Sequence, residues 1–503
     1  MAPLRGDHTL LLRLMLLLPG LCLCEAEGPG PGPGPGPGSG PGPGSGPGLR
    51  LGPGPTGHVP EFAKHFGTKT RYEDVVSPPV NLSSTTEGRC SPIHLTAVIR
   101  HGTRFPTVKN VKRMARVSRL VREMGETGDP EDVLEQLRQW EQWYTEDMDG
   151  QLVEKGRSDL SNLAMRLVSS FPGLLSEAEF HSGRISIKTS SKHRCVSSAE
   201  AFQDGLRLAW DRPRTRDQPG NRDGTTTETS PEPPSDSDYI HEVDDSLMRF
   251  FEHCRGYVEG VETNATATAE VELFKHGPEF RGVRTRVALR LGLDPDLLTP
   301  DLVEAAFFIC SYELAIKSLY SPWCRLFTKE DAKILEYKGD LKQYWRRAHG
   351  FSITPLSSCP LFHHIFRSLD KAGRPRRASD PPPEPASILI GHAETLLPLI
   401  ALLGLYKDKT PPTAANYQSQ QDRLFRSSLL VPYSAHLVFV LYDCPRGARL
   451  RLLTNEAPLL FPGATTDLPL YREVRALYRH LLDGCDYYTA CEGRPSRAPN
   501  TEL

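Results

Sequence analysis

The chain has 503 residues, and its 60 Lys and Arg nearly balance its 62 Asp and Glu, for a formal net charge of -2. This balance excludes the global positive field that nucleic-acid-binding proteins use, so any anion site must be local. The length exceeds what one small hydrophobic core organises, which predicts a core with a second part.

The N-terminal residues have the pattern of a secretory segment. Residues 1–26 combine early arginines, an apolar run and then small or polar residues, as in a signal peptide. Residues 27–60, mostly Gly and Pro, lack the apolar side chains needed to fold, so we expect a disordered leader. No later stretch approaches the roughly 18 consecutive apolar residues of a membrane span, so we expect a soluble mature chain.

The remaining chain, residues 61–490, reads as one globular unit. Strands are predicted at 93–99, 185–190, 387–390, 436–443 and 449–456, and helices at 109–124, 198–210 and 394–406. Strand, turn and helix recur, which is typical of an α/β sheet, so we assign an α/β core to about 88–215 and 384–490. Helical periodicity dominates about 240–370, which predicts an inserted helical cap. A low-complexity loop at 211–238 and a flexible tail at 491–503 complete the expected organisation.

Basic residues follow three of the predicted strands. They are Arg100, His101 and Arg104 after the first, Lys192, His193 and Arg194 after the second, and His392 with the acidic Glu394 after the third. The carboxyl ends of strands in an α/β sheet form its ligand site, so we expect these segments to meet there. Arginine forks, an imidazole and helix N-termini suit a phosphate monoester.

The same residues suggest roles in phosphoryl transfer. A neutral His101 can accept a phosphoryl group covalently, and the arginines can hold its oxygens. Glu394 opens an apolar helix and is the candidate acid for the leaving alkoxide. For Lys192 and His193 two interpretations have equal weight: they line the pocket, or they are simply solvated. The basic run from Lys109 to Arg116 is most simply the solvated face of an amphipathic helix, with extra positive charge for a polyanion as the alternative.

The segments "RHGTRFP", "TSSKHRCVSSAEAF" and "GHAETLLPL" resemble the histidine acid phosphatases, in the multiple inositol polyphosphate phosphatase branch, over about residues 60–490. The resemblance implies a phosphoglycerate-mutase-like α/β sandwich with a helical cap, and a phosphohistidine on His101. It also implies a phosphate pocket of Arg100, Arg104, Arg194 and His392, with Glu394 as proton donor and neither metal nor cofactor. Most of the wider family has aspartate where Ala393 stands, but the branch itself uses His-Ala-Glu.

The resemblance implies dephosphorylation of inositol hexakisphosphate and lower inositol phosphates, with 2,3-bisphosphoglycerate as a second substrate. One alternative is a general secreted acid phosphatase acting on small esters. A second, from another class, is a non-catalytic luminal protein that binds inositol phosphates. The presence of both His101 and Glu394 argues against the binding protein.

Secretory features extend through the chain. Sequons at Asn81 and Asn264 suit glycosylation, and eleven cysteines less Cys22 and Cys24 of the signal leave an odd number, hence at least one free thiol. The resemblance and antiparallel strand pairing favour Cys90–Cys444; Cys485–Cys491 follows from spacing and Cys254–Cys310 from the helical region, with Cys195, Cys324 and Cys359 left free. The final "NTEL" partly matches a retrieval signal, so we expect a receptor-retained protein of the endoplasmic reticulum, with secretion as the alternative.

Overall fold

The computed structural model describes residues 61–76, 90–124, 132–211, 239–375, 379–380 and 382–493. These residues belong to the second of two compact units, residues 58–503. The expected signal peptide, the Gly/Pro leader, the Asn81 sequon, residues 212–238 of the predicted loop and the "NTEL" end lie outside the described residues.

A seven-stranded mixed sheet is the centre of the fold, in the order β3-β2-β4-β1-β5-β6-β7. The strands are β1 Ser91–Arg100, β2 Ile185–Thr189, β3 Glu242–Val243, β4 Ala386–Gly391, β5 His436–Asp443, β6 Arg449–Thr454 and β7 Ala457–Leu459. β3, β2, β4 and β1 run parallel to one another, whereas β5, β6 and β7 run antiparallel to their neighbours. β6 ends two residues before the predicted limit, because Asn455 and Glu456 take positive φ values of 47° and 67° in the turn to β7.

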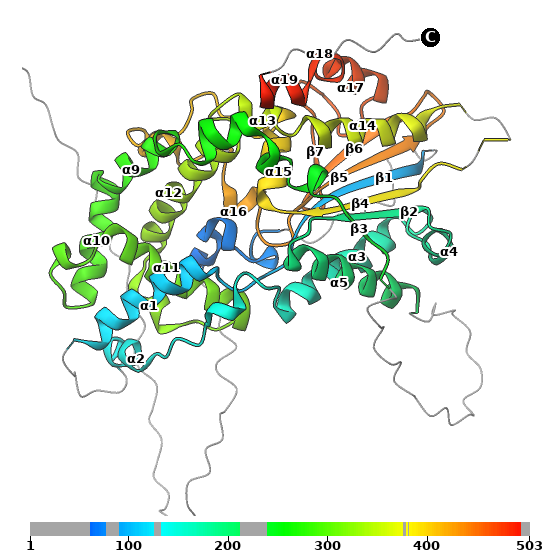
Figure 1. Cartoon of the computed structure of the whole chain (residues 1–503). Helices are drawn as coiled ribbons and strands as arrows, with labels where there is room; N and C mark the ends of the chain where they lie inside the picture. The colour runs from blue at the N-terminus through cyan, green and yellow to red at the C-terminus, as the bar shows by residue number, and fades with distance from the viewer. Residues whose placement is uncertain are drawn as a thin grey trace, which may run out of the picture. The chain divides into compact units, whose positions relative to one another are not determined.

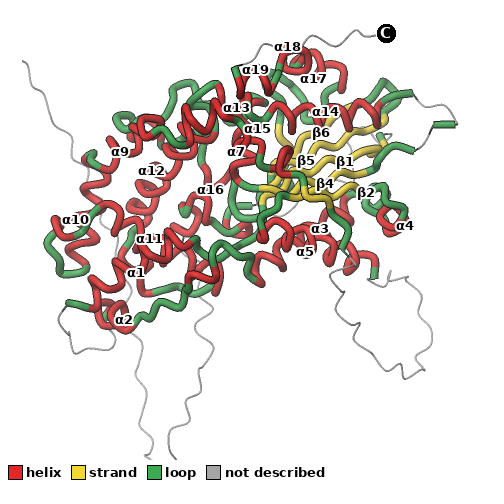
Figure 2. The backbone as a smooth tube through the Cα atoms, viewed as in Figure 1, coloured by secondary structure: helices red, strands yellow, loops and turns green. Residues whose placement is uncertain are grey.

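Helices cover both faces of the sheet (Figures 1 and 2). Alternating strand residues point to opposite faces, so Ala97 and Ile99 pack in the cluster formed with α3 (Glu154–Ser170) and α5 (His193–Trp210). Val98, between them, packs in the cluster that holds α14 (Cys359–Gly373) and α15 (Ala393–Leu402). The sheet is thus the middle layer of an α/β sandwich, and its strands are apolar on both faces.

A second set of helices has its own hydrophobic cluster. Its main members are α1 (Val108–Arg122), α9 (Ala269–Lys275), α10 (Pro278–Arg290), α11 (Pro300–Lys317) and α12 (Lys329–Arg347). The structure differs here from the expected division, because α1 packs on α11 rather than on the sheet. Conversely, α14, inside the region expected as cap, packs on β1 and β5.

The other helices are short. The α-helices are α2 Val133–Gln139, α4 Glu177–His181, α6 Asp245–Met248, α7 Phe250–His253, α8 Arg255–Tyr257, α13 Ile353–Leu356, α16 Ser427–Leu430, α17 Tyr471–Leu477, α18 Arg479–Gly484 and α19 Tyr487–Glu492. The 3-10 or π turns are η1 Glu61–His65, η2 Gly67–Lys69, η3 Tyr72–Asp74, η4 Glu146–Met148, η6 Val258–Glu262, η7 Ala265–Thr268, η8 Pro295–Leu297, η9 Pro322–Leu326 and η10 Tyr417–Gln420. Within the described ranges, no helix combines the length and apolar composition that crossing a membrane requires.

Four disulfides form among the described cysteines. Cys90 bonds to Cys444, the pair predicted from the strands, since β1 and β5 run antiparallel with Ser91 opposite Asp443. The predicted Cys485–Cys491 and Cys254–Cys310 bonds are wrong. The structure instead forms Cys254–Cys491, Cys310–Cys324 and Cys359–Cys485, which also corrects the expectation that Cys324 and Cys359 are free. Cys195 is the one free thiol among the described cysteines.

Candidate active site

The carboxyl ends of β1, β4 and β2 lie side by side. Arg100, the last residue of β1, is in register with Gly391 of β4, and Thr189 of β2 is in register with Ile390. The residues that follow each strand therefore start from one edge of the sheet. This register brings together the three segments that the sequence analysis singled out.

His101 is anchored at this edge through its backbone and its ring. Its N–H donates to the Gly391 carbonyl at 2.9 Å, and its side chain is buried. Ring atom Nδ1 lies 2.9 Å from the Gly102 carbonyl oxygen, which can only accept, so Nδ1 carries the proton. A neutral ring then has its lone pair on Nε2. Gly102 permits this packing, because a Cβ there would lie 2.4 Å from the Gly156 carbonyl oxygen.

Burial is the main cause that lowers the pKa of His101 well below its ordinary value. The nearby guanidiniums of Arg100, Arg194 and Arg104 lower it further, and His392 adds to them. Each of these effects disfavours the imidazolium. The ring therefore stays neutral in the physiological range, which is the form that can act as a nucleophile.

Arg100 is held from outside the sheet. Its Nη1 donates to the carbonyl oxygens of Thr68 at 2.8 Å and Val431 at 2.5 Å, and its guanidinium lies 4.6 Å from the centre of the Tyr433 ring. These contacts fix the guanidinium without neutralising its charge. Thr68, Val431 and Tyr433 belong to no motif, so no local sequence pattern indicates that they position Arg100.

Arg104 and Arg194 converge on one point. A Cβ on Gly150 would lie 3.7 Å from Nη1 of Arg194 and 3.9 Å from Nη1 of Arg104. The buried Nε atoms of Arg100, Arg104 and Arg194 have no hydrogen-bond partner within the described part of the chain. Three guanidiniums with unused donors around a neutral imidazole form a site for a tetrahedral oxyanion.

His392 caps α15 beside this cradle. Nη2 of Arg194 is always a donor and lies 3.2 Å from Nδ1 of His392, so Nδ1 accepts. Nε2 therefore carries the proton and donates to the Ser190 hydroxyl at 2.9 Å. Burial, followed by Arg194, lowers the pKa of His392 well below its ordinary value. The free Cys195 thiol lies 3.6 Å from His392 Nε2, and burial raises its pKa to about 11, so the thiol stays protonated.

Two predicted candidates lie at the surface. Lys192 precedes α5 and His193 begins it, and both side chains are exposed. Arg194, the next residue, is the one that reaches His392. The structure therefore joins Arg194 to the cradle and leaves its two neighbours facing solvent.

Glu394 lies two residues after His392 but lines a pocket that includes none of the cradle residues. This pocket, of about 370 Å³, is lined by Phe251, Glu252, Tyr257, Val258, Glu262, Arg347 and Glu394. The Glu394 carboxylate forms an ion pair with Arg347. Phe251 connects the two regions, with its ring centre 6.4 Å from that of His392. Glu394 and the cradle are therefore adjacent, although no described hydrogen bond joins Glu394 to His101.

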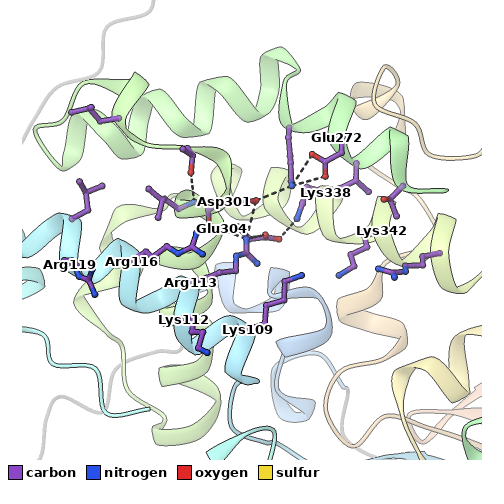
Figure 3. A pocket seen from close by; sticks show the side chains of 18 of the residues that line it. Lys109, Lys112, Arg113, Arg116, Arg119, Glu272, Asp301, Glu304, Lys338 and Lys342 are labelled. Carbon is purple, nitrogen blue, oxygen red and sulfur yellow. Dashed lines mark hydrogen bonds and ion pairs between the residues drawn. The ribbon is translucent and has the colours of Figure 1, made fainter. Parts of the chain in front are cut away.

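A cationic groove of about 830 Å³ lies among the helices of the second cluster (Figure 3). Its basic lining residues are Lys109, Lys112, Arg113, Arg116 and Arg119 of α1, Lys275 of α9, and Lys338, Lys342 and Arg346 of α12. Acidic side chains bind some of these, as Glu304 binds Arg113 at 2.5 Å. The basic run after the first motif is thus part of a groove as well as a helix face.

Two half-buried lysines lie between the groove and the cradle: Lys342 lines the groove, and Lys69 lies near the charges of both. Burial lowers the pKa of Lys69 to about 7, with Arg104, Lys342 and Arg100 among the charges that act on it. Burial also lowers the pKa of Lys342 to about 7, with Arg347 and Lys338 as the next causes. A run of cations therefore extends from the cradle into the groove, and binding of a polyanion would favour the charged form of both lysines.

A family model and named relatives both match this chain over most of its length. The family model of the histidine phosphatase superfamily (branch 2) matches residues 93–455. A human protein named multiple inositol polyphosphate phosphatase 1 is 42% identical, over 87% of this chain and 91% of that protein. The protein of the same name from Gallus gallus is 41% identical, over 85% and 92%.

Solved structures share the fold at low sequence identity. A Bifidobacterium longum multiple inositol polyphosphate phosphatase in complex with inositol hexasulfate has a TM-score of 0.63 at 14% identity, covering 82% of this chain and 97% of that one. The phytase from D. castellii has a TM-score of 0.67 at 16% identity, covering 87% and 89%. These two likenesses bear on the fold: an α/β core with a helical part.

Proposed function

The chain belongs to the histidine phosphatase superfamily (branch 2), and we propose that it is a phosphomonoesterase that removes phosphate from inositol polyphosphates. The observation that carries the proposal is the neutral, buried His101 with three arginines around it. Close relatives named for inositol polyphosphates support the substrate class. The roles of the individual residues below are part of the proposal.

In the first step, Nε2 of His101 attacks the phosphorus atom of the ester. Arg100, Arg104 and Arg194 are the donors for its oxygens, and the Nε2–H of His392 joins them by exchanging the Ser190 hydroxyl for a phosphate oxygen. The negative charge of the phosphoryl group is thus held throughout the transfer. The bond from phosphorus to the ester oxygen breaks, and its electron pair stays on that oxygen. Glu394 in its acid form gives the oxygen a proton, so the product leaves as an alcohol.

In the second step, water attacks the phosphorus atom of the phosphohistidine. The Glu394 carboxylate left by the first step accepts a proton from this water, and the bond from phosphorus to Nε2 breaks. Inorganic phosphate leaves, and both His101 and Glu394 return to their starting forms. The steps balance with water as the only co-reactant.

The cationic groove supports polyphosphorylated substrates over small esters. A substrate with one phosphate fills the cradle alone, whereas inositol hexakisphosphate carries further phosphates that Lys69, Lys342 and the α1 side chains can bind. The same reasoning admits 2,3-bisphosphoglycerate, with two phosphates, as a weaker substrate. A general acid phosphatase that acts on small esters would gain no substrate binding from these cations.

Substrate comparison tests the function directly. We expect purified protein to release phosphate from inositol hexakisphosphate with a kcat/KM well above that for p-nitrophenyl phosphate at low salt, and the advantage to shrink as salt screens the groove. Arg116→Gln should raise KM for inositol hexakisphosphate by up to about fivefold, since one exposed contact contributes about 1 kcal/mol or less. Lys333→Gln, on the α12 helix but outside the groove lining, is the matched control.

The pH dependence of KM belongs to the same test. Lys69 and Lys342 are charged below a pKa of about 7 and neutral above it, so KM for the hexakisphosphate should rise between about pH 6 and 8. KM for p-nitrophenyl phosphate should change less, because that ester does not reach the groove. Equal kcat/KM values for the two substrates at all salt concentrations would instead identify a general acid phosphatase.

We also propose that the protein resides in the lumen of the endoplasmic reticulum. Four disulfides support an oxidising compartment, and Asn264, in an exposed turn, suits glycosylation. Removal of the last four residues should raise the fraction of protein found in the medium of expressing cells. An unchanged fraction would support secretion without retrieval.

A further inference from the structure

Arg347 is the residue that binds the candidate acid. It ends α12, its side chain is 13% exposed, and Nη1 forms the ion pair with Oε1 of Glu394, whose side chain is 35% exposed. Glu262 of η6 is a weaker partner of Arg347, at 3.8 Å, because it is engaged by Arg346 at 2.8 Å. The main carboxylate held by Arg347 is therefore Glu394.

The surroundings of Glu394 favour its ionised form. It lies in the first turn of α15, where the helix dipole stabilises a negative charge, and the Arg347 guanidinium does the same. Glu252, Glu262 and Tyr257 line the same pocket and His392 lies two residues away, but Glu262 and Tyr257 are hydrogen-bonded to each other and His392 is neutral. Without substrate, the ion pair and the helix terminus therefore favour the carboxylate form of Glu394, which has no proton to donate.

The end of α12 offers a way to break this pair. Lys342 and Arg346, one helical turn apart, line the cationic groove, whereas Arg347 lines the pocket of Glu394. A phosphate dianion carries more charge than a carboxylate and presents several acceptors to a guanidinium. A phosphate bound beside the groove's end is therefore a strong competitor for Arg347.

We propose that Arg347 links occupancy of the site to protonation of Glu394, so that a second phosphate on the substrate activates the acid. In the empty site Arg347 holds the Glu394 carboxylate; in the occupied site it binds a phosphate group that is not being transferred, and the carboxylate takes one proton from solvent. This inference rests on the proposed function and narrows its substrates to esters with at least two phosphates. A monophosphate leaves the ion pair in place.

The first test compares kcat against pH for inositol hexakisphosphate, an inositol monophosphate and p-nitrophenyl phosphate. Activity that needs the acid is lost as pH rises through the pKa of Glu394, so the wild-type alkaline limb should lie at higher pH for the hexakisphosphate than for the monophosphate. Arg347→Met should move the alkaline limb of the inositol monophosphate profile to higher pH by about 1 unit or more. The same variant should also raise kcat for the monophosphate. It should also raise KM for the hexakisphosphate, and Arg347→Lys should restore part of the wild-type behaviour.

Lys333→Met is the control, because it removes a cation of the same helix that pairs with Glu330 and lines neither the groove nor the pocket of Glu394. Its monophosphate limb should stay at the wild-type pH. Unchanged limbs in Arg347→Met would overturn the proposal. If wild-type protein releases phosphate from neither inositol ester, the proposed function itself fails, which is a separate result.

The second test needs no turnover. Binding of inositol hexasulfate, which keeps its charge at all working pH values, is followed by calorimetry in two buffers of different ionisation enthalpy to count protons taken up. On binding, the wild type should take up more protons than Glu394→Gln or Arg347→Met, by as much as one proton per molecule. The double variant should take up no fewer protons than either single variant. Equal uptake by wild type and Glu394→Gln would overturn the proposal even if Arg347→Met does not fold.

Discussion

His101→Ala is expected to lower the rate of phosphate release from inositol hexakisphosphate by about 10⁴-fold or more, the scale of losing a covalent nucleophile. No other group in the cradle replaces it: His392 has its Nδ1 lone pair facing Arg194, and the Cys195 thiol stays protonated with a pKa of about 11. Phosphate release by the purified variant is the measurement. Acid-labile labelling of wild-type protein by substrate should be lost in parallel.

Binding provides the control for this variant. The guanidiniums of Arg100, Arg104 and Arg194 remain, so the alanine variant should still bind inositol hexasulfate, with an affinity close to that of the wild type. Equal turnover by the variant and the wild type would contradict a phosphohistidine route. If neither turns over the substrate while both bind hexasulfate, the protein is a binding protein rather than an enzyme.

The sequence predicts the cradle residues because the end of a strand can be recognised from a short stretch of chain. The apolar runs before His101 and His392 placed both residues at strand exits, and the parallel pairing of β1 with β4 then brings those exits together. The sheet order did not follow from the runs alone. β3 has two residues and β7 has three, too few for a period-two pattern to be visible.

Sequence patterns could not predict which distant residues pack or pair with each other in the folded chain. The basic face of α1 has the same amphipathic pattern whether it faces solvent or a groove, and only its packing on α11 distinguishes the two. Cys485 and Cys491 are close in sequence, but α19 carries Cys491 to Cys254 while Cys485 meets Cys359 of α14. Likewise Arg347 precedes Glu394 by a long stretch of chain, and no motif joins them.

Glu394→Gln is expected to separate substrates by their leaving group. An alkoxide from inositol needs a proton as it departs, so kcat for inositol hexakisphosphate should fall by about 10²- to 10⁴-fold, the usual contribution of a general acid. p-Nitrophenolate leaves without help, so the burst of p-nitrophenol from one turnover should remain fast. The alkaline limb of the pH profile should also vanish, since glutamine does not titrate.

The second step supplies a further check on the same variant. Because the carboxylate left by the first step accepts the proton of the attacking water, Glu394→Gln should hydrolyse the phosphohistidine slowly, and labelled enzyme should accumulate with p-nitrophenyl phosphate. The double variant with His101→Ala should accumulate none. A uniform loss on both esters, with no burst and no accumulation, would contradict the acid–base role and assign Glu394 to positioning through its pair with Arg347.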